Sequence, residues 1–172
     1  MHLLRRRKRV EFEVSAATFE ALILGALAGM RSMAVPALLS RAVRRGDVEG
    51  LAGTPLALLG SEKLSTALRF LMVGEIIADK FPFAPDRTFA PALAWRLFSG
   101  GLAGATVFAS EGRHRNSGAV LGALSALATS YAGEHARKTE AGETALSNAA
   151  LGALEDWIVL ALGPPLLGRK KP

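Results

Sequence analysis

Long apolar stretches alternate with short polar connections along the chain, and no stretch of useful length alternates apolar and polar residues as a strand would. Half of the chain is hydrophobic but only 6% is aromatic, because alanine, leucine and glycine dominate. Such small side chains suit closely packed helices. The pattern therefore predicts an all-α fold. The apolar stretches are residues 16–42, 64–80, 91–110, 116–133 and 144–167.

The length of these stretches indicates a membrane protein. A helix needs roughly 20 mostly apolar residues to cross a bilayer. The stretch 116–133 carries no charged residue and passes this test cleanly, whereas the others reach the length only with charged residues inside them. We predict a multi-pass helical membrane bundle with about five transmembrane helices. The alternative is a compact soluble bundle of Ala/Leu-rich helices.

Basic runs flank the apolar part and supply much of the net charge of +6. They read R-R-R-K-R at 5–9 and R-K-K at 169–171. No aromatic residue interleaves them and no nucleic-acid-binding motif follows, so we expect no nucleic-acid partner. Basic ends hold an apolar chain at a membrane surface instead. We expect one helical membrane domain over 15–168, with basic tails at 1–14 and 169–172.

The distribution of positive charge bears on orientation in the membrane. The basic N-terminal tail predicts a cytoplasmic N-terminus, in the inner membrane of the cell. Arg41, Arg44 and Arg45 follow the first apolar stretch, so we expect them on the opposite side, together with Arg113 and Arg115. Both faces would then carry positive charge and would specify the orientation only weakly.

Several ionised residues stand inside the apolar stretches: Arg31, Glu75, Asp79, Glu155 and Asp156. One charge at the bilayer centre costs about 2.5–3.5 kcal/mol, so these residues together would cost on the order of 10 kcal/mol if each faced lipid. That sum equals a typical total stability. We therefore expect them to face the interior and to pair, with Arg31 as the counter-ion. The alternative is a buried ion-pair cluster that only fixes helix register.

Three further residues are secondary site candidates. Arg96 is a second counter-ion for the carboxylates. Lys80 lies where Pro82 and Pro85 stop the second helix, so we expect it to extend to the membrane surface. Pro36 follows Arg31 and would free a backbone carbonyl within the first helix. Broken helices of this kind line transporter sites, and a plain kink is the alternative.

Glycine spacing predicts close helix crossings. Segments 25–32 and 118–125 both read G-A-x-x-G-x-x-S, and each precedes an apolar helix with acidic residues. This similarity suggests an inverted two-helix repeat, although chance matches are as frequent in a chain rich in alanine and glycine. Glycine-rich helix faces also suggest a homo-oligomer. The G-x-x-x-G pairs are Gly25/Gly29, Gly100/Gly104 and Gly118/Gly122.

Composition and residue spacing limit the catalytic chemistry that the chain can carry. The chain has no cysteine and therefore no thiolate chemistry. Its three histidines do not stand at metal-ligand spacing. A carboxylate-only Mg²⁺ site is conceivable but lacks a phosphotransferase signature. We predict no cofactor, leave the metal open and favour a protein that is not an enzyme. The Mg²⁺ site would use Glu75, Asp79, Glu155 and Asp156.

Three segments carry a resemblance to a known family: G-A-L-A-G-M-R-S-M-A-V-P, G-E-I-I-A-D-K-F-P-F-A-P-D-R-T and the late L-E-D. Together they resemble a bacterial family of small multi-pass membrane proteins known as a domain of unknown function. The resemblance covers roughly residues 20–162, and E-x-x-x-D-K-x-P-x-x-P-x-R is its most specific part. It implies an integral membrane protein and assigns no catalytic residue.

Charged residues inside apolar helices lead us to expect a small transporter or flippase. Arg31 would attract an anionic small molecule or lipid head group, and the carboxylates would form a proton- or cation-linked network. The lipid bilayer is then the main partner. One alternative is a membrane enzyme that acts on lipid phosphate with a divalent metal. The other is a non-catalytic membrane scaffold in which the ion pairs are structural.

Overall fold

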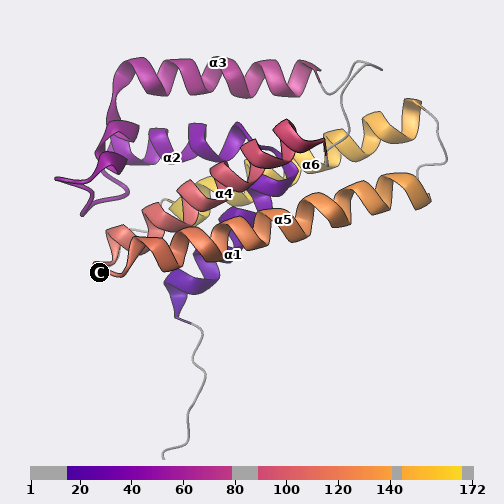
Figure 1. The fold of residues 1–172 in the computed structure, drawn as a ribbon. Helices are drawn as coiled ribbons and strands as arrows, with labels where there is room; N and C mark the ends of the chain where they lie inside the picture. Colours follow the sequence, from indigo (N-terminus) through magenta and orange to yellow (C-terminus); the bar gives the residue numbers. More distant parts are fainter. Residues whose placement is uncertain (1–14, 79–88, 141–144, 168–172) are drawn as a thin grey trace, which may run out of the picture.

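The structure is a computed structural model that describes residues 15–78, 89–140 and 145–167 (Figure 1). These residues form helices and connecting turns without a strand, which confirms the predicted all-α fold. Asp79, Lys80 and both basic tails lie outside the described residues. The helices are α1 (Ala16–Met30), α2 (Ala34–Arg45), the 3₁₀ helix η1 (Pro55–Gly60), α3 (Glu62–Ala78), α4 (Ala90–Ser110), α5 (Arg115–Glu140) and α6 (Ala145–Leu167).

The first apolar stretch forms two helices instead of one. A turn at residues 31–33 separates α1 from α2, which doubles back, so that Arg45 at its end lines the same hollow as Glu20 near the start of α1. The two helices contain 15 and 12 residues. Neither reaches the roughly 20 residues that a spanning helix needs. Together they form a helical hairpin whose tip is the turn.

Helices α4 and α5 pack against α1 in opposite directions. Arg96 near the start of α4 contacts the end of α1, and Arg113 after α4 hydrogen-bonds to Ser15 before α1, so α4 is antiparallel to α1. In α5, the hydroxyl groups of Ser125 and Thr129 donate to carbonyl groups of α1, at 2.6 and 3.0 Å. Their partners, Leu22 and Ala26, follow the same order, so α5 runs parallel to α1.

Glycine contacts make these crossings close. A Cβ atom added at Gly122 of α5 would overlap the carbonyl oxygen of Gly100 in α4. One added at Gly104 would overlap Gly118, and one at Gly25 of α1 would overlap Gly122. The predicted close helix crossings are therefore confirmed. Oligomerisation stays a prediction. The two G-A-x-x-G segments pack against each other within one chain, but they lie on helices that run parallel, whereas an inverted repeat would place them antiparallel, so the structure gives the inverted repeat no support.

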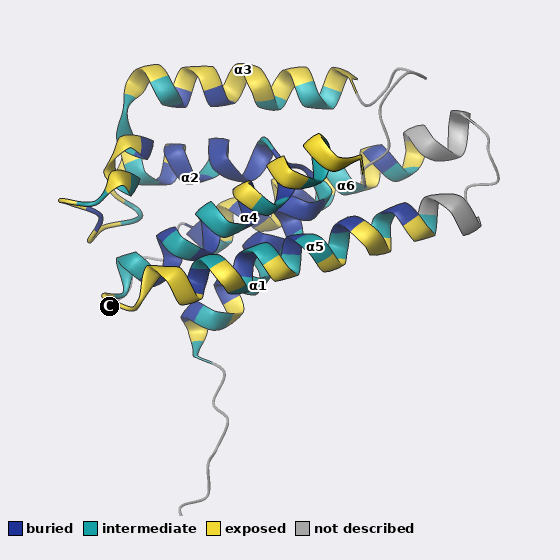
Figure 2. Ribbon diagram, in the orientation of Figure 1, coloured by how far each residue is buried: buried dark blue, intermediate teal, exposed yellow. Residues whose placement is uncertain are grey.

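Helices α3 and α6 cover α2. Helix α3 runs antiparallel to α2 along the outside of the molecule, and Figure 2 shows that much of its surface is exposed. Arg44 at the end of α2 lies 3.9 Å from Glu62 at the start of α3. The connection between them is fixed by the Ser40 hydroxyl, which donates to the Leu59 carbonyl oxygen over 2.5 Å. Helix α2 is thus largely buried between its neighbours.

Two helices are long and apolar enough to cross a membrane among the described residues: α4, and residues 150–167 of α6. The expectation that 116–133 would be the clearest span is not met, although the stretch is free of charge. It lies in α5 and carries Ser125, Thr129 and Ser130 together with several glycines, which lower its mean hydropathy. Absence of charge alone was therefore a poor criterion, and about five spanning helices are not established.

The predicted distribution of arginines over two faces was wrong. Because α2 doubles back, Arg41, Arg44 and Arg45 lie at the end of the molecule where α1 begins, not across from it. Arg113 lies there too, since it donates to Ser15, and Arg115 follows at the start of α5. We call this end, defined by these five arginines, the basic end; it is at the left in Figure 1.

Candidate functional site

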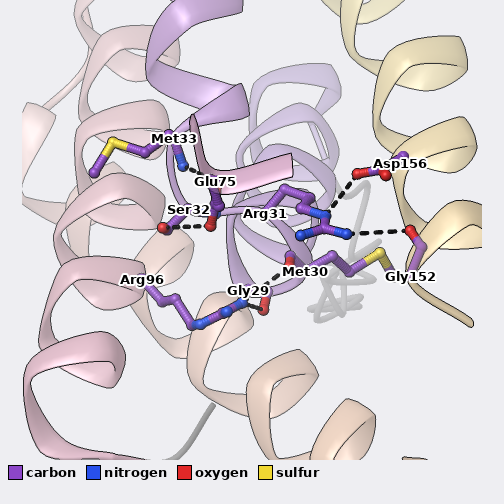
Figure 3. Close-up of polar contacts among 9 residues, drawn as sticks. All are labelled: Gly29, Met30, Arg31, Ser32, Met33, Glu75, Arg96, Gly152 and Asp156. Carbon is purple, nitrogen blue, oxygen red and sulfur yellow. Dashed lines mark hydrogen bonds and ion pairs between the residues drawn. The ribbon is translucent and has the colours of Figure 1, made fainter. Parts of the chain in front are cut away.

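The turn at the tip of the α1–α2 hairpin gathers most of the predicted site residues that the structure describes (Figure 3). Helix α1 ends because Arg31 adopts an extended conformation, with φ −135° and ψ 101°. Helix α2 begins at Ala34, which places Pro36 in its first turn. Proline has no backbone N–H, and in the first turn of a helix that N–H would have no helical partner, so Pro36 costs α2 no hydrogen bond. The predicted helix break is therefore present, but it lies at residues 31–33, before Pro36. The chain reverses direction there, so the break is a turn between two helices and not a kink within one helix.

Arg96 binds the end of α1. Its Nη1 donates to the carbonyl oxygens of Gly29, at 2.5 Å, and Met30, at 2.9 Å. These carbonyls belong to the last turn of the helix, which has no further helical donors and carries the negative end of the helix dipole. The Arg96 side chain is only 6% exposed. A buried guanidinium thus serves as a C-terminal cap supplied by another helix.

Glu75 binds the start of α2. Its Oε1 accepts from the backbone N–H of Ser32 at 2.9 Å and from the Ser32 hydroxyl at 2.7 Å. Its Oε2 accepts from the backbone N–H of Met33 at 2.8 Å. Met33, the N-cap residue, makes no capping bond with its own side chain. The carboxylate of α3 takes that role, at the positive end of the α2 dipole.

Arg31 connects the turn to α6. Its Nε lies 2.7 Å from Oδ1 of Asp156, and its Nη2 donates to the Gly152 carbonyl oxygen at 3.2 Å. The Arg31 side chain is 1% exposed and that of Asp156 is 15% exposed. A buried ion pair stays favourable only when hydrogen bonds supplement the charge attraction, and Gly152 supplies one.

The predicted cluster is therefore only partly as expected. Arg31 pairs with a carboxylate of the last helix, but Glu75 binds the backbone of the turn instead of Arg31. Arg96 likewise binds carbonyl groups. Glu155 is partly buried on α6 beside Asp156, while Asp79 and Lys80 lie outside the described residues. Within the described ranges, no three His, Cys, Asp or Glu side chains gather to hold a metal ion.

Sequence reasoning missed Ser32 and the backbone groups of the turn. A signal was present, because Ser32 precedes an apolar helical run that has a proline in its first turn, which is typical of a helix start. The signal was obscured because 16–42 reads as one apolar stretch. The three helices that contact the turn, α3, α4 and α6, could not be predicted as a set, because their contacts with the turn join positions that are far apart in the sequence.

A protein-family model matches residues 19–163, described as a domain of unknown function (DUF4126). The chain belongs to this family. The match spans the turn together with Glu75, Arg96 and Asp156, and its limits agree with those of the resemblance seen in the sequence. Comparison with curated proteins and with solved structures gives no match. The family and the geometry of the turn are therefore the two grounds for a functional proposal.

Proposed function

We propose that this protein is an integral membrane protein of the cell inner membrane, a small transporter or flippase for an anionic solute or lipid. The observation that carries the proposal is the buried turn at residues 31–33, where a helical hairpin too short to span a bilayer ends on the Arg31–Asp156 ion pair. Multi-pass insertion, with α1 and α2 as a re-entrant hairpin, belongs to the same proposal.

The distribution of apolar side chains supports a membrane location. Large apolar residues are turned outward on separate helices: Phe70 of α3 is 75% exposed, Phe98 of α4 55% and Trp157 of α6 69%. Arginines 31 and 96, by contrast, are almost completely buried. A soluble bundle favours the reverse arrangement, because exposed apolar area and buried charge both cost free energy in water. Lipid makes this arrangement favourable.

Interrupted helices have a known use in membranes. Non-helical backbone is tolerated at membrane depth only where protein or water surrounds it, and broken helices often form transporter sites. Here the turn lies beside Asp156, well inside α6, which begins at Ala145. Glu75 and Arg96 satisfy the helix ends that the break creates. They are positioning residues in our proposal, and Arg31 and Asp156 are the working pair.

In this scheme the Arg31–Asp156 ion pair exchanges partners while the site as a whole carries no net charge. As an anionic group reaches Arg31 and replaces Asp156, the Asp156 carboxylate takes up a proton or a cation in the same step. The site remains neutral at each stage, which low-polarity surroundings require. Release on the other side restores the Arg31–Asp156 pair. This scheme couples movement of one anion to movement of one positive charge.

The basic end sets the orientation in this proposal. Arg41, Arg44, Arg45 and Arg113 lie at the same end as the start of α1. An excess of Lys and Arg marks the cytoplasmic side of a membrane protein. We therefore assign the basic end, with the N-terminus, to the cytoplasm.

Reconstitution into liposomes tests transport directly. The probes are phosphatidylglycerol with a fluorescent head-group label, for flipping, and radiolabelled inorganic phosphate, for uptake. Wild-type protein should accelerate the movement of at least one probe, and Arg31→Ala and Asp156→Asn should abolish that acceleration. Arg115→Gln, an exposed arginine remote from the turn, is the control. Unchanged flux in both site variants would refute the proposal.

A non-catalytic scaffold is the second candidate, and one observation favours it. Glu75 is engaged by hydrogen bonds from the turn through both of its oxygens, so its charge already has a structural use. In a scaffold, substitution of Arg31 or Asp156 lowers the free energy of unfolding and changes no flux. The liposome experiment, combined with unfolding of the same variants in detergent, separates the two functions.

A further inference from the structure

We propose that four arginines of α2 and α3 form a binding site for a phosphate group at the basic end. They line a hollow of about 400 Å³ together with one serine. This site is separate from the turn at residues 31–33, and it does not depend on the transport proposal. The lining residues are Arg41, Arg44, Arg45, Ser65 and Arg69.

Helical spacing on two antiparallel helices brings these side chains together. Arg41, Arg44 and Arg45 stand at positions i, i+3 and i+4 of α2 and therefore share one face. On α3, Ser65 and Arg69 are one turn apart, and Nε of Arg69 donates to the Ser65 carbonyl oxygen at 3.3 Å. That bond directs the rest of the guanidinium group toward the hollow that it lines.

The positive charge in the hollow is barely neutralised. Among the described residues, Arg41, Arg45 and Arg69 form no ion pair. Arg44 lies 3.9 Å from Glu62, whose side chain is 82% exposed, and such surface pairs contribute little. The helix dipole accounts for Arg44 and Arg45, which stand in the last turn of α2. It does not account for Arg41 and Arg69, whose mutual repulsion an anionic ligand would relieve.

A phosphate group fits this donor set. Several guanidinium groups can each offer two parallel N–H groups to phosphate oxygens, which is the geometry that distinguishes arginine from lysine. Ser65 also lines the hollow and adds a hydroxyl group, which can donate to a phosphate oxygen.

The neighbouring surface indicates where the phosphate comes from. Arg41 and Arg45 also line a second hollow, of about 140 Å³. Its other walls are mostly apolar and include one carboxylate: Leu38, Ala42, Asp47, Pro164 and Leu167. Apolar walls beside a phosphate site suit the glycerol and first acyl carbons of a phospholipid. A small soluble phosphate compound shares the same head chemistry and is the other source.

Native mass spectrometry of the full chain in detergent tests the site. The probes are phosphatidic acid and diacylglycerol, which differ only in the phosphate group, and glycerol 1-phosphate, which lacks the acyl chains. Wild-type protein should retain phosphatidic acid and not diacylglycerol. The double variant R41Q/R69Q should weaken that binding at least about tenfold, as expected when charge-assisted hydrogen bonds are removed. The matched control R115Q, an arginine of the basic end that lines neither hollow, should bind like wild type.

Each outcome decides the question. If glycerol 1-phosphate binds as tightly as phosphatidic acid, the ligand is a soluble phosphate compound and not a lipid, and the hollow is still a phosphate-binding site. Equal binding of phosphatidic acid by R41Q/R69Q and wild type, or equal retention of diacylglycerol, would overturn the proposal. Should the double variant fail to fold, R41K/R69K keeps both charges and removes the forked donors. The R41K/R69K variant should still lose most of its phosphatidic acid binding. If R41K/R69K binds phosphatidic acid as tightly as wild type, the proposal is overturned.

Discussion

Glu75 and Ser32 are 43 positions apart, yet the Glu75 carboxylate accepts the Ser32 backbone N–H at 2.9 Å and its hydroxyl at 2.7 Å. A third bond, from Met33 at 2.8 Å, completes the cap of α2. Arg96 provides the opposite charge at the end of α1. Each charge thus meets the helix end whose dipole favours it, and the hairpin can turn inside an apolar bundle.

Removal of the Glu75 charge should destabilise the hairpin. Glu75→Gln keeps the shape of the side chain but presents an amide group to donors, so we expect a loss of about 1–3 kcal/mol in the free energy of unfolding. Chemical unfolding in detergent, followed by circular dichroism, measures it. The control is Glu62→Gln on the same helix, whose side chain is 82% exposed and which should change stability little. Equal effects of the two substitutions would contradict the capping role.

The Arg31–Asp156 pair should show strong energetic coupling. Arg31→Met alone leaves the Asp156 charge without its buried partner, which typically costs about 3–5 kcal/mol. Asp156→Leu in the same chain should recover much of this loss, because no charge then remains. A double-mutant cycle of unfolding free energies provides the measurement. Strictly additive effects would show that the pair contributes nothing as a pair.

Alanine should have opposite effects at two helical glycines. At Gly122 a Cβ atom would overlap the carbonyl oxygen of Gly100, so α4 and α5 must separate, and overpacking of this kind costs about 1–3 kcal/mol. At Gly74 no atom lies within 4 Å of the added Cβ. Alanine there should stabilise α3 by about 0.5–1 kcal/mol, because glycine is a poor helix former. Thermal unfolding compares the two, and a stable Gly122→Ala would refute the close crossing.

Labelling of single cysteines should reveal the orientation, since the chain has no cysteine of its own. Glu49→Cys reports on the basic end and Ala90→Cys on the opposite end, and both positions are exposed. A membrane-impermeant maleimide should modify Ala90→Cys in intact spheroplasts, and Glu49→Cys only after permeabilisation. The reverse pattern would place the basic end outside. Recovery of both variants in the soluble fraction would refute membrane insertion.

Much of the fold follows from the sequence because composition and periodicity act locally. Small residues and leucine predict helices, G-x-x-x-G predicts close crossings, and Arg31 with Pro36 predicts an interruption of the first helix. The cost of a lone charge in an apolar environment also predicts that Arg31 turns inward to a carboxylate. Membrane insertion, the route of the substrate and the roles of Asp79 and Lys80 stay predictions.

The direction of α2 was decided only by the tertiary structure. The hydrophobic pattern indicates where helices form, but it does not indicate whether the chain continues or reverses after an interruption. Arg96 and Glu75, from two other helices, satisfy the helix ends at residues 29–33 and so permit the reversal. Because the chain reverses, the arginines of α2 meet Arg69 of α3 at the end where α1 begins. Long-range hydrogen bonds to backbone groups leave no periodic trace in a sequence, and for that reason the sequence alone determined the helices while the packing decided where their charges lie.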